Sequence, residues 1–176
     1  MSHSYHIARM AVFLCLMIIG AYLQITLPTP FFAMHITMQL FVSLLAGILL
    51  PVKESLAVMA LYLMIGLLGL PVFATGGGLS YILKPTFGFL IGFLLSAGIS
   101  GMIKEKAGPH AGAWCGLALY YICGNLYYIF ATRVLLQTPV PLLIGFINSF
   151  VVSIIPDILI TILAISCAKR LSPVLH

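Results

Sequence analysis

Apolar runs long enough to cross a lipid bilayer occupy most of this chain. Breaking residues separate six runs, which cover residues 8–26, 33–50, 55–70, 85–104, 111–132 and 142–168. A helix needs about 20 apolar residues to cross a hydrocarbon core about 30 Å thick. Prolines close the first three runs, because proline lacks the amide proton that a helix interior needs. The pattern predicts an all-α membrane protein with six transmembrane helices and a single domain over residues 1–176.

Charged residues are too few for a soluble domain. They make up 6% of the 176 residues, against about 25% in an ordinary soluble domain. The net charge of +5 does not indicate nucleic-acid binding, because the basic residues stand beside apolar runs and are typical of topology signals. We expect a multi-pass protein of the cell membrane that is not an enzyme. We also expect no cofactor, no metal ion and no nucleotide-binding domain.

The basic residues also predict an orientation. If the N-terminus is inside, the residues at cytoplasmic ends are Arg9, Lys53, Lys104, Lys106, Lys169 and Arg170. Only Lys84 and Arg133 then lie outside. Because basic residues resist translocation, we expect both termini on the cytoplasmic side.

Small residues at four-residue spacing indicate close helix packing. The run 85–104 carries Gly88, Gly92, Ser96 and Ser100, and the next run carries Gly112 and Gly116. Small side chains let neighbouring backbones approach and gain van der Waals contact.

A weaker pair of small residues, Ala11 and Cys15, stands in the first run. This pair fits internal packing or a surface for a protein partner, and the spacing leaves both open.

Two ionisable residues fall inside or at the edge of predicted spans. Asp157 follows Pro156 within the last run, and Lys84 stands at the outer start of the fourth. Such a residue costs about 2.5–3.5 kcal/mol within a bilayer, so each needs a role. The structural alternative is that Lys84 reaches the outer interface. Asp157 would then pair with Lys84, or accept hydrogen bonds from backbone groups left unpaired by Pro156. We favour ligand binding for Asp157 and leave Lys84 open between the two roles.

Neutral polar residues gather in the outer half of the predicted helices. They are Gln24, His35, Gln39 and Asn125, and no comparable cluster occupies the inner half. This distribution predicts a cavity that opens outward and is closed below, not a continuous pore. Tyr121 shares a helix face with Asn125 and offers an aromatic wall. We interpret the lone His35 as structural rather than as a ligand contact.

The segment 69–89 is the most informative connection. Three successive glycines, Gly76 to Gly78, permit close approach to a ligand, and apolar neighbours such as Phe73 suit a lid over a pocket. The missing GK[ST] and the outward-facing position argue against a phosphate loop here. Thr75, Gly76 and Tyr81 are therefore candidate ligand contacts.

The same segment resembles the BioY family, the biotin-specific substrate-binding (S) components of energy-coupling factor (ECF) transporters. The likeness rests on Gly69–Gly78 (GLPVFATGGG) and Lys84–Phe93 (KPTFGFLIGF). Supporting pieces are Ile36–Leu40, Leu44–Gly47 and Pro156–Leu159. Three positions depart from the family pattern, since glycine usually stands at Lys84, Phe87 and Pro156.

The resemblance implies a membrane subunit that captures biotin from outside. It also implies an ECF transmembrane scaffold protein and two cytoplasmic ATPases as partners, with the docking surface on the first three helices. An S component for another small vitamin and a solitary small-molecule facilitator are the alternatives. The candidate substrate-binding residues are Asp157, Lys84, Asn125, Gln39, Tyr121, Thr75, Gly76 and Tyr81, with Ala11 and Cys15 as weaker docking candidates.

Overall fold

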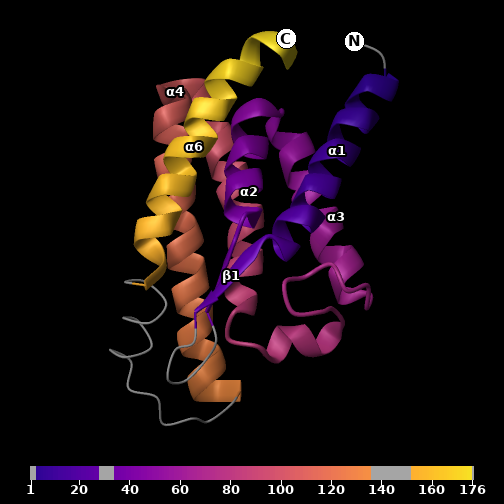
Figure 1. The fold of residues 1–176 in the computed structure, drawn as a ribbon, viewed down its shortest axis with the longest axis vertical. Coiled ribbons are helices and arrows are strands. Elements are labelled where there is room, and N and C mark those ends of the chain that lie inside the picture. Colours follow the sequence, from indigo (N-terminus) through magenta and orange to yellow (C-terminus); the bar gives the residue numbers. More distant parts are fainter. Residues whose placement is uncertain (1–2, 28–33, 136–151, 176) are drawn as a thin grey trace.

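The computed structural model describes residues 3–27, 34–135 and 152–175, and this part is mostly helical (Figure 1). The elements in chain order are α1 (His3–Tyr22), β1 (Gln24–Leu27), β2 (Met34–Thr37), α2 (Gln39–Leu49), α3 (Val52–Leu67), η1 (Leu79–Leu83), α4 (Phe87–Phe130), η2 (Ala131–Leu135) and α6 (Val152–Leu175). Both chain ends lie at one end of the molecule, whereas the strands and η1 lie toward the other (Figure 1). We call these the terminal end and the pocket end.

Proline and glycine divide the helices largely where the sequence predicts. Pro51 directly precedes α3 and separates it from α2. The α4 segment contains two predicted helices, because Gly108 has a φ of 86° and Pro109 follows it. Glycine adopts this left-handed conformation without the steric cost that a Cβ would bring. The two halves of α4 therefore fold back on each other.

The prediction is wrong at the end of the first helix and at the start of the second. Residues 24–27 and 34–37 form two antiparallel strands, with Gln24 opposite Thr37 and Thr26 opposite His35. Both stretches are rich in β-branched residues, which favour extended backbone. Gln24 and His35 consequently lie on strands rather than on helices.

The last predicted helix is only partly described. Its residues 142–151 lie outside the described residues, and α6 continues past the predicted end at 168 to Leu175. Within the described residues, Ser4–Tyr22 and Phe87–Leu135 are long and apolar enough to cross a membrane by length and composition.

The predicted small-residue packing is confirmed. A Cβ on Gly116 would collide with the Ser100 hydroxyl, and one on Gly88 would collide with Tyr127. These collisions show that the two halves of α4 touch through their glycines. A Cβ on Gly47 would lie 2.5 Å from the Ala97 carbonyl oxygen, so α2 also packs closely on α4.

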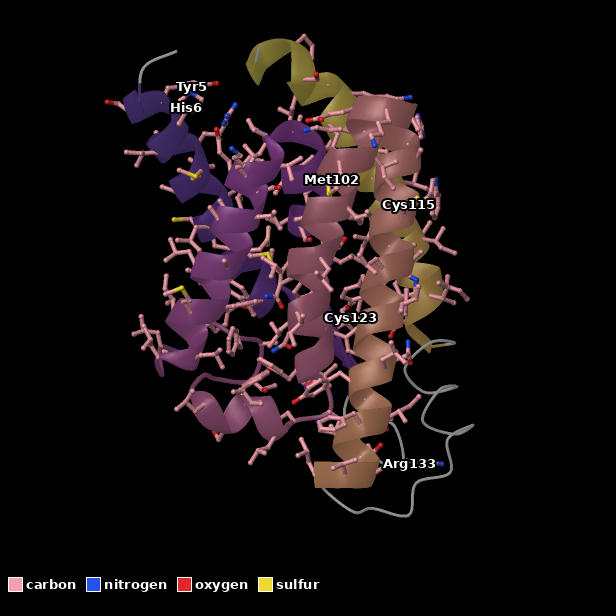
Figure 2. All side chains as sticks on the ribbon, turned by 180° about the vertical axis from the view of Figure 1, so that it is seen from behind. Tyr5, His6, Met102, Cys115, Cys123 and Arg133 are labelled. Carbon is pink, nitrogen blue, oxygen red and sulfur yellow. The ribbon has the colours of Figure 1, made fainter. Side chains whose placement is uncertain are left out.

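Charged groups at the terminal end join neighbouring helices. Glu54 on α3 lies 2.7 Å from the Arg9 guanidinium and 2.7 Å from His6 Nδ1, both on α1. Lys104 Nζ donates to the carbonyl oxygens of Ile48 at 2.7 Å and Leu50 at 2.6 Å, where α2 ends. Tyr5 and His6 lie at the opposite end of the molecule from Arg133 (Figure 2).

Candidate ligand-binding site

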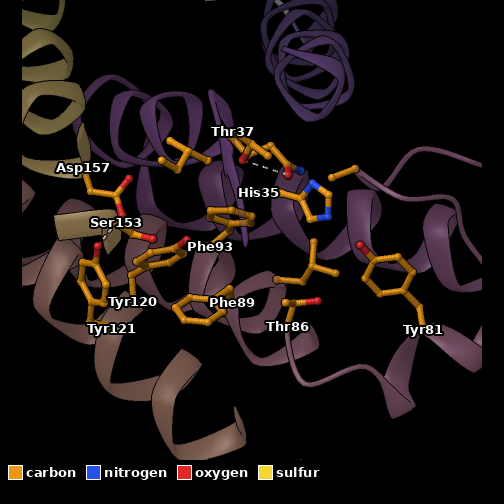
Figure 3. Close-up of a pocket in the computed structure, with 14 residues that line it drawn as sticks. His35, Thr37, Tyr81, Thr86, Phe89, Phe93, Tyr120, Tyr121, Ser153 and Asp157 are labelled. Atoms are coloured by element: carbon orange, nitrogen blue, oxygen red, sulfur yellow. Dashed lines mark hydrogen bonds between the residues drawn. The ribbon is translucent and has the colours of Figure 1, made fainter. Parts of the chain in front are cut away.

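A pocket at the pocket end collects side chains from segments far apart in the sequence (Figure 3). It lies among β2, α2, both halves of α4, α6 and the glycine-rich segment. Its lining residues are His35, Ile36, Thr37, Gln39, Ala74, Tyr81, Thr86, Phe89, Leu90, Phe93, Tyr120, Tyr121, Ser153 and Asp157.

Asp157 provides a buried carboxylate in the pocket wall. It is 5% exposed, and Oδ2 accepts a hydrogen bond of 2.5 Å from the Tyr121 hydroxyl. The Asp157 backbone carbonyl accepts a bond of 2.7 Å from Thr161, one turn further along α6. A carboxylate has about four lone-pair positions, so the Tyr121 bond leaves acceptor capacity for a ligand. The structural alternative, in which Asp157 pairs with Lys84, is not seen among the described residues, where Asp157 bonds to Tyr121 and Lys84 to Thr75.

Stacked aromatic rings form the wall beside this carboxylate. Phe93 and Tyr120 stack with ring centroids 5.2 Å apart and planes 20° apart. Phe89 contacts Tyr120 at 5.1 Å and Tyr121 at 6.5 Å. Such surfaces hold apolar parts of a small molecule, while a few polar groups fix its orientation.

His35 belongs to the pocket lining, although its sequence context suggested a structural role. Its Nδ1 lies 3.0 Å from the Thr26 hydroxyl across the hairpin. Burial first and the positive charge of Lys84 second lower the pKa of His35. The β-branched residues around it were the one sequence signal for a strand that turns this side chain toward the pocket.

Gln39 lines the pocket and also ties it to the glycine-rich segment. Its amide nitrogen donates to the Tyr62 hydroxyl at 2.5 Å, and its amide oxygen lies 3.3 Å from the Thr37 hydroxyl. Tyr62 in turn donates to the Val72 carbonyl at 3.0 Å. Gln39 thus positions its neighbours as well as facing the cavity.

Lys84, Thr75 and Tyr81 form one cluster beside the pocket. Lys84 Nζ lies 2.9 Å from Thr75 Oγ1 and 4.3 Å from the centre of the Tyr81 ring. Thr75 Oγ1 also lies 3.1 Å from the Tyr81 hydroxyl. Tyr81 reaches the pocket lining, whereas Lys84 and Thr75 adjoin it.

The remaining candidates support the wall from outside the lining. Gly76, with a φ of 117°, forms a tight turn with Phe73. Asn125 Nδ2 donates to the Tyr121 carbonyl at 2.9 Å. Asp157, Gln39, Tyr121 and Tyr81 therefore meet in one cavity, and their ligand roles stay predictions.

Known proteins are similar in sequence to this chain over nearly its whole length. The BioY family model matches residues 1–176. A probable biotin transporter BioY from Lysinibacillus sphaericus is 36% identical over 172 residues, covering 94% of this chain and 85% of the relative. One from Pyrococcus horikoshii is 30% identical over 171 residues, covering 94% of each.

A solved structure shares the fold. It is the S component for biotin from an ECF-type ABC transporter, and it matches with a TM-score of 0.76 over 97% of this chain and 94% of the other, at 24% identity. This chain therefore has the same fold as that S component. The family match and the curated relatives go further, and the chain belongs to the BioY family.

Proposed function

We propose that this chain is the biotin-binding subunit of an ECF-type transporter, with no catalytic chemistry of its own. Its relatives in the BioY family are named as biotin transporters. The observation that carries the proposal is the buried Asp157 carboxylate beside stacked aromatic rings in one pocket. An ionised carboxylate accepts hydrogen bonds only, so it matches the two N–H donors of the ureido ring. The aromatic wall offers a surface for the apolar bicyclic ring.

Lys84 is assigned to an oxygen of the ligand. Its Nζ lies beside Tyr81, a lining residue, and is held by the neutral Thr75 rather than by a carboxylate. A ligand oxygen could replace one of these neutral contacts. The valerate carboxylate and the ureido carbonyl are both chemically suited.

The topology belongs to the same proposal. Six spans with both termini in the cytoplasm would place the pocket end outside, where biotin is captured. The shared location of the two chain ends supports an even number of spans (Figure 1), and the bias of basic residues toward that end supports its cytoplasmic placement. The cell membrane is then the site of action, and the ECF scaffold and ATPases meet the terminal end.

Partner docking is assigned to α1, α2 and α3. On α1, Ala11 and Cys15 are exposed. Small exposed residues permit a partner helix to approach closely. This face is our candidate for contact with the transmembrane scaffold protein.

An equilibrium titration of the purified full chain tests the ligand assignment. Biotin and a panel of other vitamins are each titrated in detergent, and we expect saturable binding of biotin alone. Tighter binding of another vitamin would contradict the assignment of biotin and would favour an S component for that vitamin.

An uptake experiment separates the binding subunit from a solitary facilitator. Vesicles containing this chain alone should show no accumulation of biotin against a gradient, whereas vesicles that also contain the scaffold and ATPases should. Concentrative uptake by the chain alone would contradict the proposed dependence on a partner.

A further inference from the structure

Four leucines at the pocket end face outward, and the proposed function makes no use of them. Leu68, Leu70, Leu79 and Leu83 are exposed by 82%, 56%, 70% and 55%. All four belong to the segment 68–84 that contains the glycine triplet. We call them the leucine rim. A group of exposed leucines this close in sequence indicates contact with another apolar phase.

The rim is not the exterior of an unfolded loop. Within the same segment, Phe73 is fully buried and Tyr81 is 5% exposed. The Phe73 ring lies 5.4 Å from the Tyr62 ring and packs on Gly66, where a Cβ would collide with it. The segment therefore has a well-packed interior that excludes the leucines.

The rim lies at a depth where a spanning helix still has an apolar exterior. The Tyr127 hydroxyl on α4 donates to the Ile82 carbonyl in η1, which fixes η1 beside the last turns of α4 (Figure 1). Here α4 exposes Leu126 by 64% and Phe130 by 48%. The segment Phe87–Leu135, which comprises both halves of α4 and η2, is apolar and long enough to cross a membrane by length and composition. The leucines thus continue the outer surface of a membrane helix.

The backbone of the segment satisfies many of its own polar groups. Phe73 N–H donates to the Gly76 carbonyl at 2.9 Å, and Gly76 N–H returns a bond at 3.2 Å. Gly78 N–H donates to the Gly66 carbonyl at 2.7 Å, and Tyr81 N–H donates to Gly78 at 3.0 Å. Irregular backbone near hydrocarbon requires such internal partners, because lipid offers none.

The charge pattern agrees with a lipid surface. Residues 68–84 contain no acidic residue, and Lys84 is their one basic residue. Lys84 Nζ bonds to Thr75 and lies over the Tyr81 ring instead of projecting from the rim.

We propose that the leucine rim is immersed in lipid at the pocket end, which is the outer leaflet in the proposed topology, and that lipid, not a protein, covers it. Lifting the segment into water would remove the leucines from lipid, which is unfavourable. The glycine-rich segment is consequently a fixed, lipid-anchored wall of the pocket and not a lid that swings into the aqueous phase.

Tryptophan fluorescence tests this placement in the full chain. Trp114 is the only tryptophan, so a Trp114→Phe background accepts single probes. The test variants are Leu79→Trp and Leu83→Trp. Ile122→Trp, on the exposed face of α4, is the lipid reference, and His110→Trp, at the exposed kink of α4, is the water reference. Each protein is reconstituted in phosphatidylcholine nanodiscs with plain or brominated acyl chains.

We expect both rim probes to lose intensity in brominated lipid as Ile122→Trp does and to resist quenching by iodide. Quenching by iodide like that of His110→Trp, without quenching by bromine, would place the rim in water and overturn the proposal. Resistance to both quenchers would mean that protein covers the rim, which also overturns it.

A second quenching measurement, at saturating biotin, tests whether the wall is fixed. It rests on the proposed function, so a titration first establishes occupancy. Unchanged bromine quenching supports a fixed wall, and a shift toward iodide quenching overturns that part. If biotin does not bind, the proposed function fails, while the quenching of the free protein still decides the position of the rim.

Discussion

At the terminal end Glu54 contacts two basic side chains, whereas at the pocket end the contacts described for Asp157 and Lys84 are with neutral groups. Glu54 holds both Arg9 and His6 on the neighbouring helix. Among the contacts described for Asp157 and Lys84, the partners are the Tyr121 hydroxyl and the oxygens of Thr75. The difference separates two uses of charge. Opposite charges in contact fix α1 to α3 through Glu54, whereas Asp157 and Lys84, held by neutral groups in the pocket region, retain capacity for a ligand.

Uptake should respond most strongly to the α1 surface. Ala11→Phe is expected to abolish uptake in cells that contain the partner module, because a bulky ring prevents close helix approach. Biotin binding by the purified variant should stay at the wild-type level, since Ala11 is exposed and does not line the pocket. Loss of binding would instead place Ala11 in the packing of the protein, and full uptake would remove it from the docking surface.

Glu54→Gln should strongly reduce stability. The Arg9 side chain is 7% exposed and the Glu54 side chain 15% exposed, so the variant leaves a buried cation unpaired. Breaking such a pair costs about 3 kcal/mol or more. Thermal unfolding in detergent measures the loss, and Glu105→Gln, which changes an exposed carboxylate, is the matched control. Equal midpoints for the two variants would show that the pair contributes nothing.

Asp157→Asn should reduce the affinity for biotin rather than the stability of the fold. It keeps the shape of the side chain but weakens biotin binding by about 1.5–3 kcal/mol, the range for hydrogen bonds to a charged group. Isothermal titration against Glu105→Gln measures the change. Wild-type affinity in a folded variant would show that Asp157 does not bind the ligand. It would also contradict the use of its charge for ligand binding at the pocket end.

Lys84→Ala distinguishes the two oxygens assigned to this lysine. If the valerate carboxylate is its partner, wild type should prefer biotin over biotin amide by about 1 kcal/mol, and the variant should lose that preference. If the ureido carbonyl is the partner, both ligands should weaken equally. Unchanged affinity for both ligands would show that Lys84 contacts only Thr75 and Tyr81 and not the ligand.

The smallest expected effect concerns the pH dependence of stability through His35. Burial and the charge of Lys84 lower its pKa below the ordinary 6.5, so the folded protein disfavours the protonated ring. Below pH 6.5 the unfolded chain binds more protons, and stability falls as pH falls through the lowered pKa. His35→Gln should flatten this decline in thermal midpoint, whereas the exposed-site control His110→Gln should not. An unchanged pH profile would contradict the assignment.

Helix boundaries were largely predictable where proline or glycine sets them. Pro51 ends one helix and begins another because its effect on backbone is local. The strands were not predicted, since Ile25 and Ile36 extend apolar runs that also read as helix. Their pairing joins residues separated along the chain and depends on tertiary packing.

The chemistry of the site was easier to predict than its geometry. Asp157 stood out because a carboxylate inside an apolar run needs a reason. Its bond to Tyr121 joins residues 36 positions apart and follows from the packing of α6 on α4. Phe89 and Phe93 were missed because aromatic residues in an apolar helix carry no signal that separates a pocket wall from lipid contact.

The shortness of α2 has a consequence for biosynthesis. Its 11 residues span about 16 Å, roughly half the hydrocarbon thickness, and almost every one is buried in the finished protein. A segment this short does not partition into the bilayer as an independent helix. We therefore expect α2 to leave the translocation channel together with α3, as a hairpin bent at Pro51, and to reach its central position only when α4 and α6 arrive to surround it.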